Sequence, residues 1–138
     1  MSDGYWRRRP FAPVPSTRLI GIDELVPPAA RAFTFGAGPN AFRMFIVRSI
    51  SGELRGYLNL CPHASLTLDR DSGEFLTPDR DAIFCRQHCA IFSMLDGRCF
   101  SGACEGEYLH PIELALIDGW VCIGSRPNDP PESGGAAI

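Results

Sequence analysis

The chain has 138 residues, of which 45% are hydrophobic and 21% are charged. This composition is that of an ordinary globular protein and excludes collagen, a coiled coil or a wholly disordered chain, and the length fits one domain with its own hydrophobic core. The formal net charge of -3 argues against nucleic acid as a partner, because a surface that binds phosphate normally carries an excess of basic residues. No apolar stretch has the length that spans a bilayer, which argues against a membrane partner.

Residues 1–16 are rich in arginine and proline and show no periodicity, so we predict a flexible N-terminal arm. Arg7, Arg8 and Arg9 are then solvated charges, or a docking point for an acidic partner. Six cysteines suit a secreted disulfide framework, but a proline-rich segment follows the arginines where an export signal has its apolar core. We therefore expect a cytoplasmic protein.

Residues 17–124 show the alternation of apolar and polar side chains that is typical of β-strands and form the predicted domain. Residues 22–25 make one turn of helix at most, because Pro27 and Pro28 stop it. The glycine-rich residues 36–40 are a predicted hairpin loop. The first strands are expected at 18–21, 30–35, 42–48 and 54–60.

The second half of the domain continues this pattern of short strands and turns. Asp96-Gly97 and Asp118-Gly119 are strong hairpin signals. The tail, residues 125–138, is rich in proline and glycine and is predicted to be disordered. Strands are expected at 82–84, 91–95, 98–100, 110–117 and 120–124. The sequence thus predicts a small all-β domain between two irregular ends.

Two short motifs hold the chemically informative residues, Cys61-Pro62-His63 and Cys85-Arg86-Gln87-His88. Each closes a predicted strand and supplies one thiolate and one imidazole. A structural zinc site usually takes two Cys from one turn and two His from a later helix. A two-iron cluster has two distinguishable metals, so a Cys from each loop can bind one iron and a His from each loop the other. The interleaved order favours the iron–sulfur cluster, and a zinc site is the alternative.

With their flanking residues, these motifs resemble the Rieske 2Fe-2S family, and the similarity runs from about Leu19 to Gly124. The residues that carry it are Leu60-Cys61-Pro62-His63, Phe84-Cys85-Arg86-Gln87-His88, Phe92, Asp96-Gly97 and Gly102-Ala103-Cys104. The resemblance implies an antiparallel sandwich or barrel base with a small cluster-binding subdomain. It also implies one 2Fe-2S cluster per chain. Cys61 and Cys85 would then bind one iron, and His63 and His88 the other.

Within this family the chain looks most like the soluble Rieske-type ferredoxins, which implies a one-electron carrier between a flavoprotein reductase and a terminal oxygenase. Rieske oxygenases add a catalytic domain with a single iron held by two His and a carboxylate. After His63 and His88 only His110 remains, so we expect no enzyme. Two alternatives stand: a small Rieske subunit of a larger enzyme such as nitrite reductase, and a zinc-stabilised binding module. All four expected ligands are present, which counts against the first, since those subunits often lack them.

The resemblance also bears on the reduction potential, which for Rieske centres spans about -150 to +300 mV and rises with hydrogen bonds to the sulfurs. High-potential respiratory members carry a Ser and a Tyr two and four residues after the second His, where this chain has Ala90 and Phe92. They also carry a disulfide between the ligand loops, and the matching positions here are Leu66 and either Arg86 or Gln87. We therefore expect a potential at the low end of the range.

Several positions depart from the family pattern. Cys89 and Ser65 stand where relatives have glycine, so we expect the loops to be shaped differently. The resemblance also implies that a third loop, residues 101–106, covers the cluster, which would bring Cys89 and Cys104 close to it. We expect these two residues to be free thiols rather than a disulfide, because the compartment is reducing. Cys99 and Cys122 lie in apolar strands and are interpreted as small core residues.

The connection between the two motifs is longer than we expect for Rieske ferredoxins, with 21 residues between His63 and Cys85. Surface loops tolerate insertion at a small entropic cost, so we predict a longer hairpin at residues 69–81. This hairpin is also a candidate contact with a partner. His110, which precedes Pro111, is interpreted as a structural or surface residue.

Overall fold

The structure is a computed structural model that describes residues 5–61, 67–69, 73–86, 89–102, 104–124 and 136–137. Within these residues, the strands form two four-stranded sheets and one three-stranded sheet, and all of their pairings are antiparallel. Short 3-10 helices occur at η1 (Tyr5–Arg8), η2 (Ile22–Glu24) and η3 (Gly38–Asn40). None of the helices in the described ranges has the length and apolar character needed to cross a membrane. The predicted all-β class is confirmed.

The central sheet contains β2 (Ala29–Phe35), β3 (Phe42–Arg48), β4 (Leu54–Leu58) and β8 (Pro111–Ile112), in that order. Successive side chains of a strand point to opposite faces of its sheet. In β3, Met44 and Ile46 therefore belong to one buried core, whereas Phe45 and Val47 belong to another. The central sheet separates these two cores.

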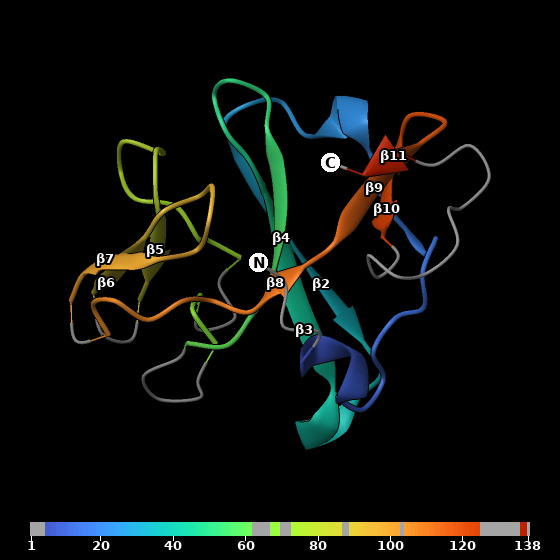
Figure 1. Cartoon of the computed structure of the whole chain (residues 1–138), viewed down its shortest axis with the longest axis horizontal. Helices are drawn as coiled ribbons and strands as arrows, with labels where there is room; N and C mark the ends of the chain where they lie inside the picture. Colours follow the sequence, from blue (N-terminus) through green and yellow to red (C-terminus); the bar gives the residue numbers. More distant parts are fainter. Residues whose placement is uncertain are drawn as a thin grey trace.

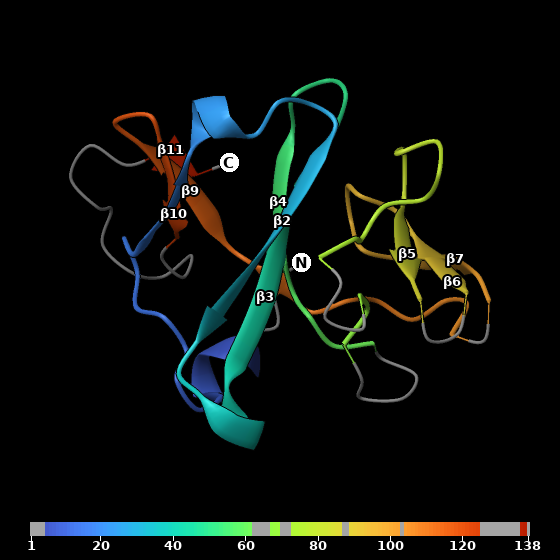
Figure 2. The same ribbon diagram turned by 180° about the vertical axis from the view of Figure 1, so that it is seen from behind.

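The first core lies between the central sheet and a second sheet, which orders β1 (Arg18–Gly21), β10 (Trp120–Ile123), β9 (Leu114–Ile117) and β11 (Ala136–Ala137). Figures 1 and 2 show β9, β10 and β11 on one side of β3 and β4. We call this interior the base core. It consists of Trp6, Ile20, Leu25, Phe42, Met44, Ile46, Leu54, Leu58, Ile112, Leu114, Val121 and Ile123. Each large apolar side chain buried here contributes roughly 1.5–3 kcal/mol, which holds the two sheets together as the predicted sandwich.

The second core lies on the other side of the central sheet, against β5 (Ile83–Cys85), β6 (Ala90–Phe92) and β7 (Cys99–Ser101) (Figures 1 and 2). We call it the subdomain core, and it includes Cys61 and Cys85. The ring of Phe45 stacks on that of Phe75 with centroids 4.3 Å apart. The three short strands and this core form the small subdomain that the family resemblance implied.

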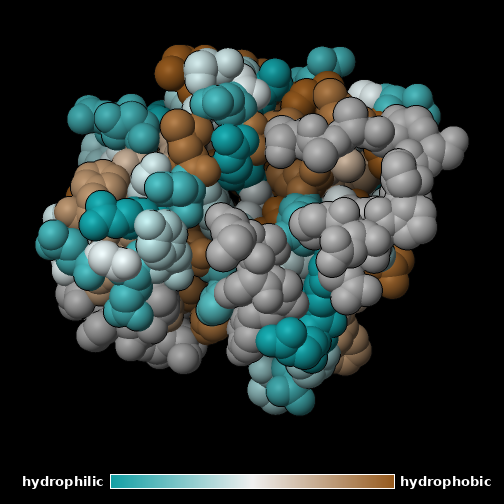
Figure 3. Space-filling view, viewed as in Figure 1, coloured by the Kyte–Doolittle hydropathy of each residue, from teal (hydrophilic) through white to brown (hydrophobic). Residues whose placement is uncertain are grey.

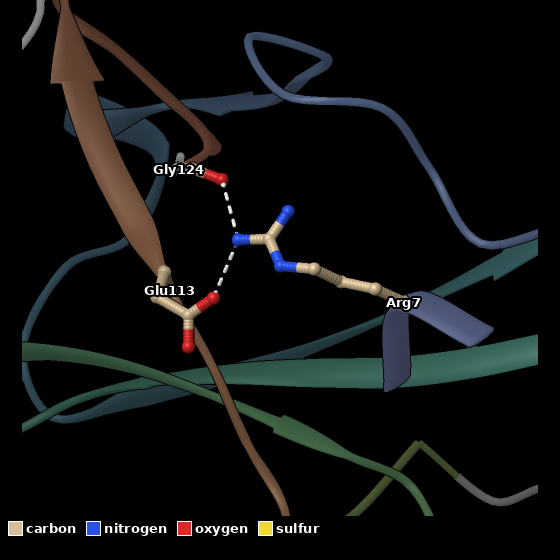
Figure 4. A network of polar contacts seen from close by, with 3 residues as sticks. All are labelled: Arg7, Glu113 and Gly124. Carbon is tan, nitrogen blue, oxygen red and sulfur yellow. Dashed lines mark hydrogen bonds and ion pairs between the residues drawn. The ribbon is translucent and has the colours of Figure 1, made fainter. Parts of the chain in front are cut away.

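The N-terminal segment packs on the base. Trp6 is fully buried in the base core, with its ring centroid 6.1 Å from that of Phe42. Arg7 Nη2 donates to Glu113 Oε1 at 2.6 Å and to the carbonyl oxygen of Gly124 at 3.3 Å (Figure 4). These contacts differ from the flexible arm expected over residues 1–16 and from the solvated arginine expected at position 7. The reason is that one buried ring and one half-buried ion pair anchor a segment whose composition is typical of a loop.

Most predicted strands lie within one residue of their expected bounds, but the strand expected at 54–60 ends at Leu58, and two others are divided or end early. The strand expected at 110–117 is divided into β8 and β9, because the chain passes from the central sheet to the base sheet at Glu113. There the N–H of Gly124 donates to the carbonyl of Glu113 at 2.8 Å. The strand expected at 91–95 ends at Phe92, since the following residues turn and the N–H of Gly97 donates to the carbonyl of Ser93 at 2.9 Å.

The described part of the connection forms a hairpin that joins residues 75–77 to residues 82–84, whereas the hairpin was predicted at 69–81. The N–H of Thr77 donates to the carbonyl of Ala82 at 3.0 Å, and that of Phe84 donates to the carbonyl of Phe75 at 2.7 Å. The connection is not confined to the surface, however, because Asp69 and Phe75 are buried.

The C-terminal tail expected at 125–138 is described only in part, since residues 125–135 and 138 lie outside the described residues. Ala136 pairs with Leu116, and Ala137 pairs with Ala115, so this short piece adds a strand to the base sheet.

The exterior shows no segregation into a polar and an apolar side in the view of Figure 3, where the coloured hydrophilic and hydrophobic side chains are interspersed. Exposed apolar residues such as Leu95, Phe100 and Tyr108 are common on globular proteins. The surface therefore agrees with the composition, which predicts a globular domain.

Candidate metal centre

Cys61, the first expected ligand, follows β4 at the point where the chain leaves the central sheet. The N–H of Asn59 donates to the carbonyl of Arg43 at 2.9 Å, and the N–H of Leu60 donates to the carbonyl of Leu58 at 2.9 Å. The Cys61 side chain is fully buried in the subdomain core. The central sheet thus places this thiol inside the subdomain.

Cys85, the second expected ligand, is the last residue of β5 and is also fully buried in the subdomain core. The N–H of Cys89, the residue after the second motif, donates to the Cys85 carbonyl at 2.9 Å. In β6, Ala90 stands opposite Cys85 in the ladder. The hairpin of β5 and β6 therefore fixes the backbone on both sides of the second motif.

A backbone hydrogen bond joins the second motif to the segment that follows the first motif. The N–H of Arg86, the residue after Cys85, donates to the carbonyl of Leu68 at 2.8 Å. Leu68 follows the loop that begins at Cys61. Because both thiols also belong to one buried core, the structure brings the two expected cysteine ligands into the same part of the subdomain.

His63 and His88, the other two expected ligands, lie outside the described residues. Among the residues that are described, no three metal-binding side chains form a group, and the description of the centre therefore rests on the two cysteines. His110 lies near the end of β4, where its carbonyl accepts a hydrogen bond from the N–H of Leu58 at 2.9 Å.

A third loop, which follows β7, packs against the strand after the second motif. A Cβ atom at Gly102 would lie only 2.7 Å from the Cα atom of Ala90, so a residue with a side chain cannot take this position unless the backbone moves. The φ of Gly102, 109°, is also in the left-handed region that favours glycine. This contact brings the third loop against the second ligand loop, as the resemblance implied.

Cys104 of the third loop contacts another cysteine. Its Sγ lies 3.1 Å from Sγ of Cys99, and both side chains are fully buried, whereas Cys89 is exposed. Burial, and then the hydrogen bond with Cys99, raises the pKa of the Cys104 thiol to about 12. Cys89 and Cys104 form no disulfide, as expected, but the sulfur beside Cys104 is that of Cys99 and not that of Cys89.

The second ligand loop keeps a backbone shape that suits glycine, although it carries a cysteine there. Cys89 has a φ of 56°, in the left-handed region that side chains other than glycine enter at a cost. At Cys89 the chain thus has the backbone conformation that glycine favours, and the expected difference in loop shape stays a prediction. Ser65, the other departure from the family pattern, lies outside the described residues.

Ala90 and Phe92 occupy the two positions where high-potential members of the family carry a hydroxyl group, and both side chains are fully buried next to the second motif. Ala90 and Phe92 have no exposed surface and flank the middle residue of β6. Their side chains contain no hydrogen-bond donor, so neither adds a hydrogen bond to a sulfur.

Sequence reasoning missed two buried polar residues, Asn59 and Asp69, which lie on either side of the first motif. Their side chains are bonded to each other. The only signal in the sequence was the presence of polar residues at both ends of an apolar, cysteine-containing segment, and that signal does not distinguish a buried pair from a solvated loop.

The fold and the centre define a class of protein: a small antiparallel β domain that buries one thiol from each of two joined loops, as iron–sulfur proteins with ligands on paired loops do. The sequence matches the family model of the Rieske [2Fe-2S] domain over residues 23–114. The chain belongs to this family. A Rieske domain carries a 2Fe-2S cluster, and the donor set fits it, because each loop contributes a thiol that is shielded from water.

Solved structures with the same fold include both ferredoxins and oxygenases. The ferredoxin of carbazole 1,9a-dioxygenase from Nocardioides aromaticivorans IC177 has a TM-score of 0.62 and 18% identity over 82% of this chain and 100% of that chain. The ferredoxin of Sphingomonas yanoikuyae B1 has a TM-score of 0.57 and 22% identity over 80% and 99% of the two chains. The quaternary ammonium Rieske monooxygenase CntA in complex with L-carnitine has a TM-score of 0.60 and 24% identity, and the match covers 84% of this chain but 33% of that one. No curated protein matches the sequence significantly.

Proposed function

We propose that this protein is a one-electron carrier, a Rieske-type ferredoxin, in which Cys61 and Cys85 bind one iron of the cluster and His63 and His88 bind the other. The observation that carries the proposal is the pair of fully buried thiols on two loops that the bond from Arg86 to Leu68 joins. When bound, a cluster of this kind supplies the reversible uptake of one electron. The residues of the chain hold the thiols and keep water away from them.

The proposed potential lies toward the low end of the Rieske range of about -150 to +300 mV. Neutral imidazoles in place of two thiolates make the electron easier to accept than in an all-cysteine cluster, whereas hydrogen bonds to the sulfurs would raise the potential further. Ala90 and Phe92 supply no such bonds. A low potential suits delivery of electrons to an oxygenase.

The proposed partners are a terminal oxygenase, which takes up the electron, and a flavoprotein reductase, which supplies it. Support for the oxygenase comes from a solved structure described as a complex of reduced oxygenase and oxidized ferredoxin in carbazole 1,9a-dioxygenase, with a TM-score of 0.59 and 18% identity over 81% of this chain and 95% of that chain. In this proposal the chain is itself no enzyme and acts in the cytoplasm, where a reducing environment keeps its remaining cysteines as thiols.

The ligand set is tested by EPR spectroscopy of the dithionite-reduced protein, together with metal analysis of the same sample. We expect two irons per chain and a rhombic signal with an average g value below that of all-cysteine clusters, which reflects mixed His and Cys ligation. Substitution Cys85→Ser should abolish the signal. A colourless protein with one zinc per chain would contradict the proposal and support a zinc-stabilised module.

Electron transfer is tested separately by stopped-flow mixing of the reduced protein with an oxidised Rieske oxygenase. We expect the visible spectrum of the protein to reoxidise with one electron transferred per chain, and a flavoprotein reductase with NADH to reduce it again. Isolation of the protein only as a stable complex with a large enzyme subunit would contradict a free carrier.

A further inference from the structure

Among the described residues, the buried polar or charged side chains are those of Asn59 and Asp69, which are 7% and 3% exposed. Asn59 precedes Cys61 by two residues, and Asp69 lies where the chain returns from the first ligand loop. A polar group is costly to bury unless it is hydrogen-bonded, and a charged one more so. The bonds made by these two side chains therefore matter for the first ligand loop.

The two side chains form a hydrogen-bonded chain across the ends of the loop. The N–H of Leu68 donates to Asn59 Oδ1 at 2.8 Å, and Asn59 Nδ2 donates to Asp69 Oδ1 at 3.2 Å. Asp69 Oδ2 accepts a hydrogen bond from the N–H of Gly73 at 2.9 Å. Both oxygens of Asp69 and both polar atoms of the Asn59 amide are thus engaged, so the pair ties the start of the loop to its end.

The same chain of bonds continues to the second ligand loop and to the central sheet. Leu68 donates its N–H to Asn59 and accepts at its carbonyl the N–H of Arg86, the residue next to Cys85. Asn59 donates its own N–H to the carbonyl of Arg43 in β3. One continuous path therefore connects the sheet, the residue two before Cys61 and the residue after Cys85.

We propose that Asn59 and Asp69 are positioning residues that form a clamp, which holds the two cysteine loops at a fixed separation and slows the loss of iron from the cluster. The proposal rests on the proposed function in one respect, namely that Cys61 and Cys85 are ligands. A fully satisfied buried polar network makes the local structure rigid and specifies one arrangement. An apolar pair of the same shape could be nearly neutral for folding, so the role of the clamp lies in the geometry that it imposes.

The structure suggests a reciprocal substitution as the test. In Asp69→Asn the side chain offers one acceptor to two donors, from Asn59 and Gly73, so one hydrogen bond is lost. In Asn59→Asp a carboxylate faces the carboxylate of Asp69, and the bond between the two side chains is lost. The double variant Asn59→Asp/Asp69→Asn restores the three hydrogen bonds described above: the new carboxylate accepts from Leu68 and from the new amide, whose oxygen accepts from Gly73.

The measurement is the rate of iron release to a chelator from the purified holoprotein, with EPR g values and the reduction potential of each variant. We expect each single variant to release iron about tenfold faster, the change in rate that about 1.4 kcal/mol produces, and to shift the potential. The double variant should return to within about twofold of the wild type, because each lost hydrogen bond to a charged group is restored.

The matched control is Ile46→Val, which removes one methylene group from the base core and lowers the melting temperature without touching the clamp. Iron release from the single variants at the rate of this control, or from the double variant at the rate of the single ones, would overturn the proposal. The EPR signal of the wild type tests the proposed ligands. The order of iron-release rates among the variants tests the clamp. Either proposal can therefore be contradicted without the other.

Discussion

Cys89 adopts a φ of 56° directly after the second motif, and its N–H donates to the carbonyl of Cys85. The loop therefore needs a left-handed residue at this position, and the chain meets that need with a residue that has a side chain. For an L-residue other than glycine this conformation costs roughly 1–2 kcal/mol. Other interactions in the folded protein therefore offset the cost of the left-handed conformation of Cys89.

Substitution of this residue by glycine should stabilise the protein. Relief of the left-handed strain exceeds the added chain entropy of glycine in the unfolded state, which costs about 0.4–1 kcal/mol. We expect Cys89→Gly to unfold at a higher urea concentration than Cys89→Ala, with a gain of about 0.5–1 kcal/mol. The alanine variant is the control, because it removes the sulfur and keeps the strain. A glycine variant that is no more stable than the alanine variant would show that the loop relaxes at no cost.

Among the elements of the fold, the third loop packs closely against β6 near the centre. Gly102 packs on the Cα atom of Ala90, whereas Gly106, in the same loop, has open space where its Cβ would be. Both glycines have positive φ, of 109° and 92°. Both positions therefore require a left-handed backbone, but a Cβ would meet a neighbouring atom only at Gly102.

Alanine substitutions at these two glycines therefore measure how much the contact between Gly102 and Ala90 contributes to stability. Gly102→Ala and Gly106→Ala both incur the left-handed penalty, but only the first also forces a methyl group against backbone, which costs about 1–3 kcal/mol more. We expect Gly102→Ala to be less stable than Gly106→Ala by this amount in urea unfolding, and to lose iron faster. Equal effects of the two substitutions would mean that the third loop does not rest on the second ligand loop.

Short apolar segments bounded by turn residues could be predicted as strands from the sequence. The strands at 18–21 and 42–48 have their expected bounds, and the apolar run in the second strand fits a sheet that has a core on each face. The division at Glu113 could not be predicted, since it depends on which sheet each half of the segment joins. Trp6 could not be placed either, because its burial depends on a cavity that the sheets create.

For the metal centre, the sequence indicated the type of cofactor, but it did not indicate which residues hold the ligand loops in place. The order of Cys and His in the two motifs predicts a two-iron site from the residue types alone, and the cofactor prediction is confirmed by the family match. The clamp of Asn59 and Asp69 has no periodic or motif signal, because it arises from a loop that returns to its own start. The neighbour of Cys104 was missed for the same reason.

For the whole molecule, the central sheet couples the base to the subdomain. β3 contributes side chains to both cores, and Tyr57 of β4 reaches from the sheet into the subdomain core. Its hydroxyl donates to the carbonyl of Met94 at 2.8 Å, in a fully buried position. The subdomain that holds the cluster is thereby fastened to the sheet from which Cys61 emerges.

Burial raises the pKa of the Tyr57 hydroxyl above its ordinary value, and Asp96 adds to this rise while Arg55 opposes it. In the unfolded chain this tyrosine ionises near pH 10, whereas in the folded protein it keeps its proton to higher pH. Above pH 10 the unfolded state therefore holds fewer protons than the folded state, and stability falls with rising pH. Below pH 10 the contribution of Tyr57 is present in full.

The Tyr57→Phe variant should therefore differ from the wild type in a pH-dependent way. Between pH 7 and 9 we expect it to be less stable by about 1 kcal/mol, the usual net value of one hydrogen bond. Above pH 10 the deficit should shrink and then reverse, because only the wild type gains an ionised tyrosine on unfolding, at about 1.4 kcal/mol per pH unit. Urea unfolding at a series of pH values measures this, with Tyr108→Phe, at an exposed position, as the control that should show neither effect. A constant deficit up to pH 11 would mean that the Tyr57 hydroxyl is accessible to water and that the two halves of the molecule are less firmly joined than the buried hydrogen bond indicates.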